Sequence, residues 1–159
     1  FAFAEQRGEK PFFVALDGIE DPFNLGAIVR SAEVLGAHGV IIPQRRSAAM
    51  NASAVKTASG AQNYLPIARV GNLSQTLEQL KVRGLFVACA DMEGDSAVRC
   101  NLTGAIVLVI GSEGKGVSPG IKKKADLLVR IDMPGRVESL NASAAAAILI
   151  YEKKRQDGA

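Results

Sequence analysis

The sequence predicts an α/β domain built on a mostly parallel sheet with helices on both faces. Short runs rich in apolar and β-branched residues alternate with amphipathic stretches along the whole chain, which is typical of β-α-β units. The most apolar run, residues 106–110, is apolar on both faces, so helices must cover both sides of the sheet. With 159 residues and a hydrophobic content of 48%, the chain is sized for one compact domain.

Six strands are expected, because six short runs combine apolar and β-branched residues. In chain order they are residues 12–16, 39–42, 65–70, 85–89, 106–110 and 127–131. Helices are expected where apolar residues recur on one helical face. The first such set is Leu25, Ile28, Val29, Ala32 and Leu35, and the second is Leu73, Leu77 and Leu80. Asn72 with Gln75 can form a capping box for the second helix, and Ser118-Pro119 is the start signal of a further one.

Composition argues against several classes of protein. No apolar run approaches the roughly 20 residues of a membrane span, and the basic start of a signal peptide is missing, so we expect a soluble, cytoplasmic protein. Cys89 and Cys100 form no CxxC pair and His38 is the only histidine, which argues against a zinc site or a disulfide scaffold. The net charge of +3 and the pI of about 9.0 permit an anionic partner without requiring one.

The first ten residues, FAFAEQRGEK, mix aromatic and charged side chains without helical or strand periodicity. The chain also begins with Phe1 rather than Met. We interpret residues 1–10 as the remnant of a linker from an upstream region, and residues 11–159 as the domain itself.

Ligands of a parallel sheet bind beyond the carboxyl ends of its strands, so the loops that follow strands are candidate sites. The first, DGIEDPFNLGAIVRSAEVLG, places Asn24 near the start of a helix that carries Arg30, and the two side chains can project toward one crevice. The alternative is that Asn24 is a helix cap and Arg30 a solvated residue. However, Arg30 is enclosed by Ile28, Val29 and Ala32, and a guanidinium in an apolar stretch needs an anionic partner.

The second loop, IGSEGKGVSP at residues 110–119, offers three glycines and the carboxylate of Glu113 before the next helix. Glycines let a ligand approach backbone N–H groups. The spacing does not match a Walker A loop or G-x-G-x-x-G, and Ile110 breaks the G-x-S-x-G pattern around Ser112. A purely structural turn remains the alternative.

The third loop lies in PGRVESLNASAAAAILIYE, residues 134–152, where a polar loop runs directly into an alanine-rich helix. Ser139 and Asn141 supply a hydroxyl and an amide, and Asn141 or Ser143 can cap the helix. Alanines at 142 and 144–147 let another backbone come close. An ordinary capped core helix is the alternative for this segment taken alone.

Together, NLGAIVRSA, IGSEGKGVS and IDMPGRVESLNAS resemble, in order and spacing, the three motifs of the SpoU (TrmH-type) family of RNA ribose 2′-O-methyltransferases in the SPOUT superfamily. The resemblance covers roughly residues 11–154 and is greatest to members that modify guanosine in large-subunit rRNA. It implies S-adenosylmethionine bound by a C-terminal deep trefoil knot, an exception to the usual absence of knots. It also implies an RNA substrate, with rRNA favoured over tRNA, and no metal. Finally, it implies a homodimer in which the alanine-rich helix packs against the second subunit.

The resemblance also assigns residues of this chain to the site, and two of its positions depart from the family pattern. The residues matched to the catalytic centre are Asn24, Arg30, Glu113, Ser139 and Asn141. Those matched to cofactor contacts are Gly111, Gly114, Ile131, Met133, Ser139, Leu140 and Asn141. Asp132 replaces a usual proline and Glu138 a usual small residue; both add negative charge, and Asp132 does not fix φ as proline does.

With no histidine at hand, family proposals give the role of base to the position of Arg30. Because arginine keeps its proton in proteins, a phosphate anchor is the alternative role. Two other functions compete. A non-catalytic RNA- or nucleotide-binding module would need only basic patches such as residues 44–46 and 122–124, and not Glu113 in a glycine-rich pocket. A methyltransferase for proteins or small molecules more often carries the Rossmann glycine fingerprint, which is missing from this chain.

Overall fold

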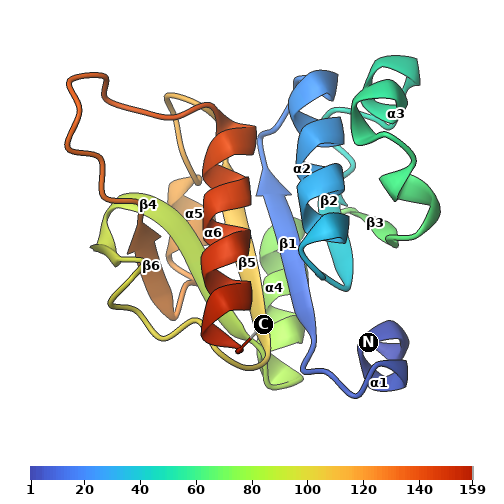
Figure 1. The fold of residues 1–159 in the computed structure, drawn as a ribbon, viewed down its shortest axis with the longest axis horizontal. Helices are drawn as coiled ribbons and strands as arrows, with labels where there is room; N and C mark the ends of the chain where they lie inside the picture. The colour runs from blue at the N-terminus through green and yellow to red at the C-terminus, as the bar shows by residue number, and fades with distance from the viewer. Residues whose placement is uncertain (159) are drawn as a thin grey trace.

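A six-stranded parallel sheet forms the centre of the computed structural model, which describes residues 1–158 (Figure 1). The strands are β1 (Phe12–Asp17), β2 (Gly39–Pro43), β3 (Ile67–Val70), β4 (Phe86–Ser96), β5 (Ile106–Gly111) and β6 (Leu127–Arg130). The α-helices are α1 (Ala2–Gln6), α2 (Pro22–Val34), α3 (Ala52–Ala58), α4 (Leu73–Val82), α5 (Pro119–Lys122) and α6 (Ala142–Gln156), and a short 3-10 helix, η1, spans Ala61–Asn63. The α/β class and the mostly parallel sheet are therefore confirmed.

The strand order is β3-β2-β1-β5-β4-β6, so β1 and β5 lie at the centre. These two strands pair along their whole length, from Phe12 with Ile106 to Asp17 with Gly111, and every residue of β5 before Gly111 is buried. After β6, at the sheet edge, the chain returns across one face, where α6 packs against α2 and β5. A C-terminal knot requires such a return path, and the knot itself stays a prediction.

Helices cover both faces of the sheet, as its apolar strands require. In Figure 1, α2 and α6 lie on the near face, while α4 lies behind the sheet. Successive side chains of β1 pack into the hydrophobic layers on opposite faces of the sheet, because side chains of a strand alternate between its two faces. Val14 and Leu16 join the core under α2 and α6, whereas Phe13 and Ala15 join the core under α4 and α5.

The fold differs from the expectations at one strand and at two short helices. The fourth strand was expected at residues 85–89 but extends to Ser96, since β4 continues past an irregularity after Ala90 and pairs again with β6 at Asp95. Two short helices were not expected: α3, capped by Asn51, and α1, which lies in the stretch without helical periodicity. Within residues 1–158, no helix combines the length and the hydropathy that a membrane span requires.

Residues 1–10 pack onto the domain. Helix α1 buries Ala4, and the Phe1 ring contacts the Phe13 ring edge-on at 5.1 Å. His38, which is 3% exposed, accepts a hydrogen bond from the Phe12 amide at Nδ1 and shares one with Glu9 at Nε2. His38 therefore fastens the N-terminal segment to the beginning of β1, and the origin of that segment as a linker stays a prediction.

Candidate active site

Three loops meet beyond the carboxyl ends of the central strands, at the top of Figure 1. They are the segments after β1, after β5 and after β6. Asp17 at the end of β1 ties the first two together, because its carboxylate accepts a hydrogen bond of 2.7 Å from the Ser118 amide. His38 lies at the other end of β1, so the only histidine of the chain is far from this edge.

Glu113 is the centre of a polar cluster that joins all three segments. Its Oε1 accepts hydrogen bonds from Asn141 Nδ2 at 2.8 Å, from the Ala142 amide at 3.1 Å and, at 3.5 Å, from Asn24 Nδ2. Asn141 Nδ2 also donates to Asn24 Oδ1 at 3.1 Å. The structure thus brings together three predicted site residues, which are 28 to 117 positions apart in the sequence.

The N-terminus of α6 fixes the position of the polar cluster. Asn141 is its N-cap, and Asn141 Oδ1 accepts hydrogen bonds from the Ser143 and Ala144 amides at 2.9 and 3.2 Å. The carboxylate of Glu113 adds a negative charge at the same helix end, which the helix dipole favours. Asn141 therefore uses its oxygen to begin the helix and its NH₂ group to hold Glu113 and Asn24.

The loop that carries Glu113 folds back tightly on itself. Ser112 and Gly116 form an isolated bridge, with a hydrogen bond of 2.8 Å from the Gly116 amide to the Ser112 carbonyl. A Cβ at Gly111 would collide with the backbone of Gly116 and Val117, so only glycine fits there. Gly114 adopts a φ of 79°, in the left-handed region that favours glycine. Glu113 consequently projects from a constrained turn.

The segment 131–141 differs from the other two, and we call it the 131–141 loop. It contains no regular secondary structure, and within residues 1–158 the part from 133 to 140 makes no hydrogen bond to the rest of the chain. Backbone N–H and C=O groups need partners when water is excluded. Those of this loop are free to bind a ligand laid against it.

A cavity of about 720 Å³, the loop cavity, lies between the 131–141 loop and the turn around Glu113. This volume is within the range of roughly 300–1,000 Å³ that is usual for small-molecule sites. The predicted cofactor contacts that line it are Gly111, Gly114, Ile131, Met133, Ser139 and Leu140. Asn141 does not line it, but donates to Glu113, which does.

Sequence reasoning missed one wall of the loop cavity. Asp91, Met92 and Glu93 line it from the far part of β4, beyond the point at which that strand was expected to end. Lys122 Nζ pairs with Asp91 at 2.7 Å. Partial burial raises the pKa of Asp91, but hydrogen bonds from Lys122 and from the Glu93 amide outweigh it and leave the pKa below its ordinary value. Recognising the longer strand would have led to these residues.

The remaining predicted catalytic residues, Ser139 and Arg30, lie outside the polar cluster. Ser139 is exposed and makes no hydrogen bond within the described chain. The expected apolar enclosure of Arg30 was wrong, because Arg30 is exposed while Ile28 and Val29 are fully buried. Successive helical residues are about 100° apart, so neighbours in sequence point to different faces. The catalytic role of these two residues stays a prediction, as does that of Asn24, Glu113 and Asn141.

Comparison with known proteins gives a consistent result. A model of the SpoU rRNA Methylase family matches residues 11–151. YacO of Bacillus subtilis (strain 168), provisionally named a TrmH family tRNA/rRNA methyltransferase, is 46% identical over 155 residues, which make up 96% of this chain and 62% of YacO.

Two solved structures share the fold. The SpoU methyltransferase AviRb from Streptomyces viridochromogenes, in complex with the cofactor AdoMet (S-adenosylmethionine), is 32% identical with a TM-score of 0.85, and the match covers 93% of this chain and 58% of AviRb. An AdoMet-bound rRNA methyltransferase from Sinorhizobium meliloti is 30% identical with a TM-score of 0.85, over 91% of this chain and 56% of that protein. The chain thus spans less than two thirds of each of these three relatives, and the family match over residues 11–151 shows that it belongs to the SpoU rRNA Methylase family.

Proposed function

We propose that the chain is the catalytic domain of an S-adenosylmethionine-dependent RNA ribose 2′-O-methyltransferase, with rRNA the favoured substrate and tRNA the second. The observation that carries the proposal is the cluster of Asn24, Glu113 and Asn141 at the rim of a cavity whose loop has free backbone groups. Such substrates imply a cytoplasmic enzyme.

The residues of the loop cavity suit S-adenosylmethionine. The unpaired backbone groups of residues 133–140 offer donors and acceptors to its polar atoms, and Ile131 and Leu140 offer apolar contacts. When bound, the cofactor supplies a methyl group already activated by a positively charged sulfur. Glu113 and Asn141 hold the start of α6 and the Gly111 turn in fixed register beside it, so the chain supplies positioning. No group of three or more metal-ligating side chains gathers in residues 1–158.

Arg30 acts on the RNA in this proposal. Its side chain is exposed and pairs with no carboxylate in the described chain, which leaves the guanidinium available to a phosphate next to the target ribose. Ser139, exposed on the 131–141 loop, and Asn24, held in the cluster with Glu113 and Asn141, are further polar groups at this edge. We assign them to orienting the ribose hydroxyl.

The two basic patches of the sequence are not equivalent in the structure. In residues 122–124, Lys122 pairs with Asp91 and Lys124 pairs with Glu78 at 3.0 Å, so two of the three charges are locally neutralised. In residues 44–46, Arg45 and Arg46 are exposed and pair with no carboxylate of the described chain. The segment carrying them is anchored by a hydrogen bond of 2.8 Å from the Ala48 amide to the Ile19 carbonyl, in the loop that leads to Asn24. We therefore assign residues 44–46 to RNA phosphate contacts.

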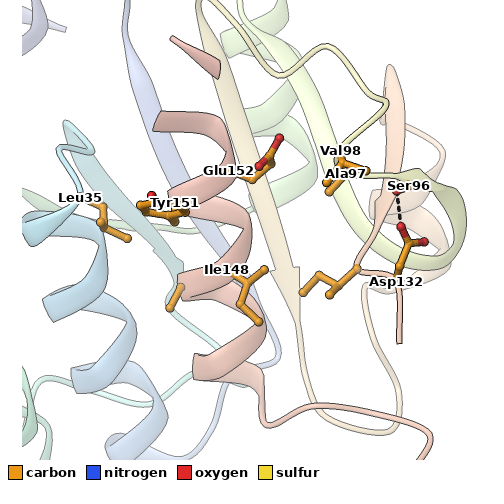
Figure 2. Close-up of a pocket in the computed structure, with 10 residues that line it drawn as sticks. Leu35, Ser96, Ala97, Val98, Asp132, Ile148, Tyr151 and Glu152 are labelled. Atoms are coloured by element: carbon orange, nitrogen blue, oxygen red, sulfur yellow. Dashed lines mark hydrogen bonds between the residues drawn. The ribbon is translucent and has the colours of Figure 1, made fainter. Parts of the chain in front are cut away.

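We also propose a homodimer formed through α6. A groove of about 530 Å³, the α6 groove, is lined by Leu35, Ala97, Val98, Ala147, Ile148 and Tyr151, with Ser96, Ile131, Asp132 and Glu152 completing it (Figure 2). Ile148 and Tyr151 are 43% and 59% exposed, which is unusual for large apolar side chains on a helix that otherwise packs inward. A second copy of the chain covers this face.

The decisive experiment measures transfer of a labelled methyl group from S-adenosylmethionine to purified rRNA and to purified tRNA, followed by mapping of the modified nucleotide. We expect labelling of a ribose 2′ oxygen in rRNA. Binding of rRNA without any labelling, in a preparation that binds the cofactor, would favour the competing non-catalytic module. Labelling on a base would contradict the reaction type.

The basic patches are tested by RNA binding at several salt concentrations. Arg45→Ala should weaken the binding of rRNA and reduce the salt dependence of that binding. Lys124→Ala removes a charge that is already paired and should change neither.

A further inference from the structure

The 131–141 loop is held only at its two ends, since residues 133–140 make no hydrogen bond to the rest of the described chain. Its far end is fixed by Asn141, which caps α6 and donates to Glu113. Its near end follows Arg130, the last residue of β6. The contacts at that near end therefore decide the direction in which the loop leaves the sheet.

Asp132 makes those contacts with both carboxylate oxygens. Ser96 Oγ donates to Asp132 Oδ2 at 2.5 Å, and Arg130 Nε donates to Asp132 Oδ1 at 3.1 Å. Figure 2 shows the bond to Ser96, which comes from the end of β4. Both bonds favour the ionised carboxyl, and the hydrogen bond from Ser96, with Arg130 beside it, holds the pKa of Asp132 below its ordinary value.

The two donors are themselves fixed by the sheet. Ser96 is 5% exposed and pairs with Arg130 across β4 and β6, where the Ala97 amide donates to the Arg130 carbonyl at 2.9 Å. Arg130 also donates through Nη1 to the Gly94 carbonyl at 2.7 Å. Gly94 lies so close to the Leu128 backbone that any Cβ there would collide with it. Asp132 is thus attached to rigid points on two neighbouring strands.

We propose that Asp132 is a positioning residue for the site: its carboxylate clamps the near end of the 131–141 loop to β4 and β6 and so sets how the loop covers the loop cavity. The neighbours of Asp132 on both sides, Ile131 and Met133, line that cavity. A freed near end would let the loop sample other paths, and binding would then have to order it. The part concerning cofactor affinity rests on the proposed function, and the part concerning loop order does not.

Two alanine variants, at Asp132 and Ser96, and one matched control test the clamp. Asp132→Ala removes both bonds. Asp95→Ala is the matched control, because Asp95 is an exposed neighbour of Ser96, carries the same charge and makes no side-chain hydrogen bond in the described chain. Arg136 is the one basic residue between 131 and 141 and is exposed, so tryptic cleavage after it, identified by the mass of fragment 137–159, reports the mobility of the loop.

We expect Asp132→Ala to accelerate cleavage after Arg136 at least about fivefold at an unchanged melting temperature, with Asp95→Ala like the wild type. By calorimetry, the Kd for S-adenosylmethionine should rise about tenfold, while turnover at saturating cofactor changes little. Ser96→Ala should give a smaller effect that does not add to that of Asp132→Ala.

Equal cleavage rates in Asp132→Ala and the wild type would overturn the inference. Cleavage accelerated as much in Asp95→Ala as in Asp132→Ala would also overturn it, because loss of a negative charge alone would then explain the result. Faster cleavage with an unchanged Kd would overturn the role in cofactor positioning. If the wild-type chain does not bind S-adenosylmethionine at all, the proposed function fails, and the cleavage rates still decide on the clamp.

Discussion

Asn141 serves the fold through its side-chain oxygen and the site through its side-chain nitrogen, and two substitutions separate the roles. Oδ1 caps α6 by accepting from the Ser143 and Ala144 amides, while Nδ2 donates to Glu113 and Asn24. Asn141→Ala removes both sets of bonds. Asn141→Ser keeps an oxygen that caps a helix equally well but is too short to reach the other side of the cluster.

The magnitudes follow from these bonds. Loss of an N-cap costs about 1 kcal/mol, and the two side-chain hydrogen bonds of Nδ2, one exposed and one part-buried, contribute about 0.5 kcal/mol each. Asn141→Ala should therefore lower the free energy of unfolding by about 2 kcal/mol, and Asn141→Ser by about 1 kcal/mol. Both should reduce methyl transfer by about 10²-fold, because the cluster is no longer held in register.

Asn72 provides the control, since its Oδ1 caps α4 by accepting from the Gln75 amide, far from the cluster in the sequence. Asn72→Ala should cost about 1 kcal/mol and leave methyl transfer unchanged. Urea unfolding and single-turnover methyl transfer on all four proteins supply the data. Wild-type transfer rates in Asn141→Ser, or equal losses of transfer in Asn141→Ala and Asn72→Ala, would refute the reasoning.

Gly111, Arg30, Ile148 and His38 provide four further tests. Gly111→Ala forces the Glu113 turn open and should weaken S-adenosylmethionine binding at least about tenfold by calorimetry; unchanged affinity would contradict the tight turn. Arg30→Ala should lose more than about tenfold in turnover and Arg30→Lys less, whereas a Lys variant that gains activity from pH 7 to 10 would indicate a base. Ile148→Lys should give monomers by light scattering, and a stable dimer would exclude the α6 groove as the interface. Burial lowers the pKa of His38 despite its bond to Glu9, so the neutral form is favoured in the fold and stability should fall as pH drops below about 6.5; an equally steep fall in His38→Gln would refute that origin.

The sheet could be predicted from the sequence because its strands are apolar, and the exception has a physical reason. Residues 91–96 read DMEGDS, a composition disfavoured in strands. They nevertheless extend β4, because Asp95 and Ser96 pair with residues of β6. Side-chain hydrogen bonds from Ser96 to Asp132 and from Arg130 to the Gly94 carbonyl strengthen this pairing. This is a tertiary effect that no local pattern contains, and it also concealed the wall of the loop cavity formed by Asp91 to Glu93.

The site could be predicted from its three motifs together, though not from any motif alone. Asn24, Glu113 and Asn141 are each ordinary in their own segments, and their convergence depends on the order of β1, β5 and β6 in the sheet. Arg30 shows the limit of local reasoning. Its apolar neighbours in sequence occupy the faces of α2 that meet the core, so their presence says nothing about the surroundings of Arg30.

The alanine run of α6 has a broader reason than closeness to a partner. Ala142 and Ala146 are buried in the core shared with α2, Ala145 lines the loop cavity, and Ala147 lines the α6 groove. Within two turns, this helix thus borders the core, the loop cavity and the α6 groove. A large side chain at one of these alanines would overpack the core or occupy the cavity or groove that the alanine faces. A substitution at Ala146 therefore reports on core packing and one at Ala145 on the cavity. Of these positions, only Ala147, beside Ile148, can report on contact with a second subunit.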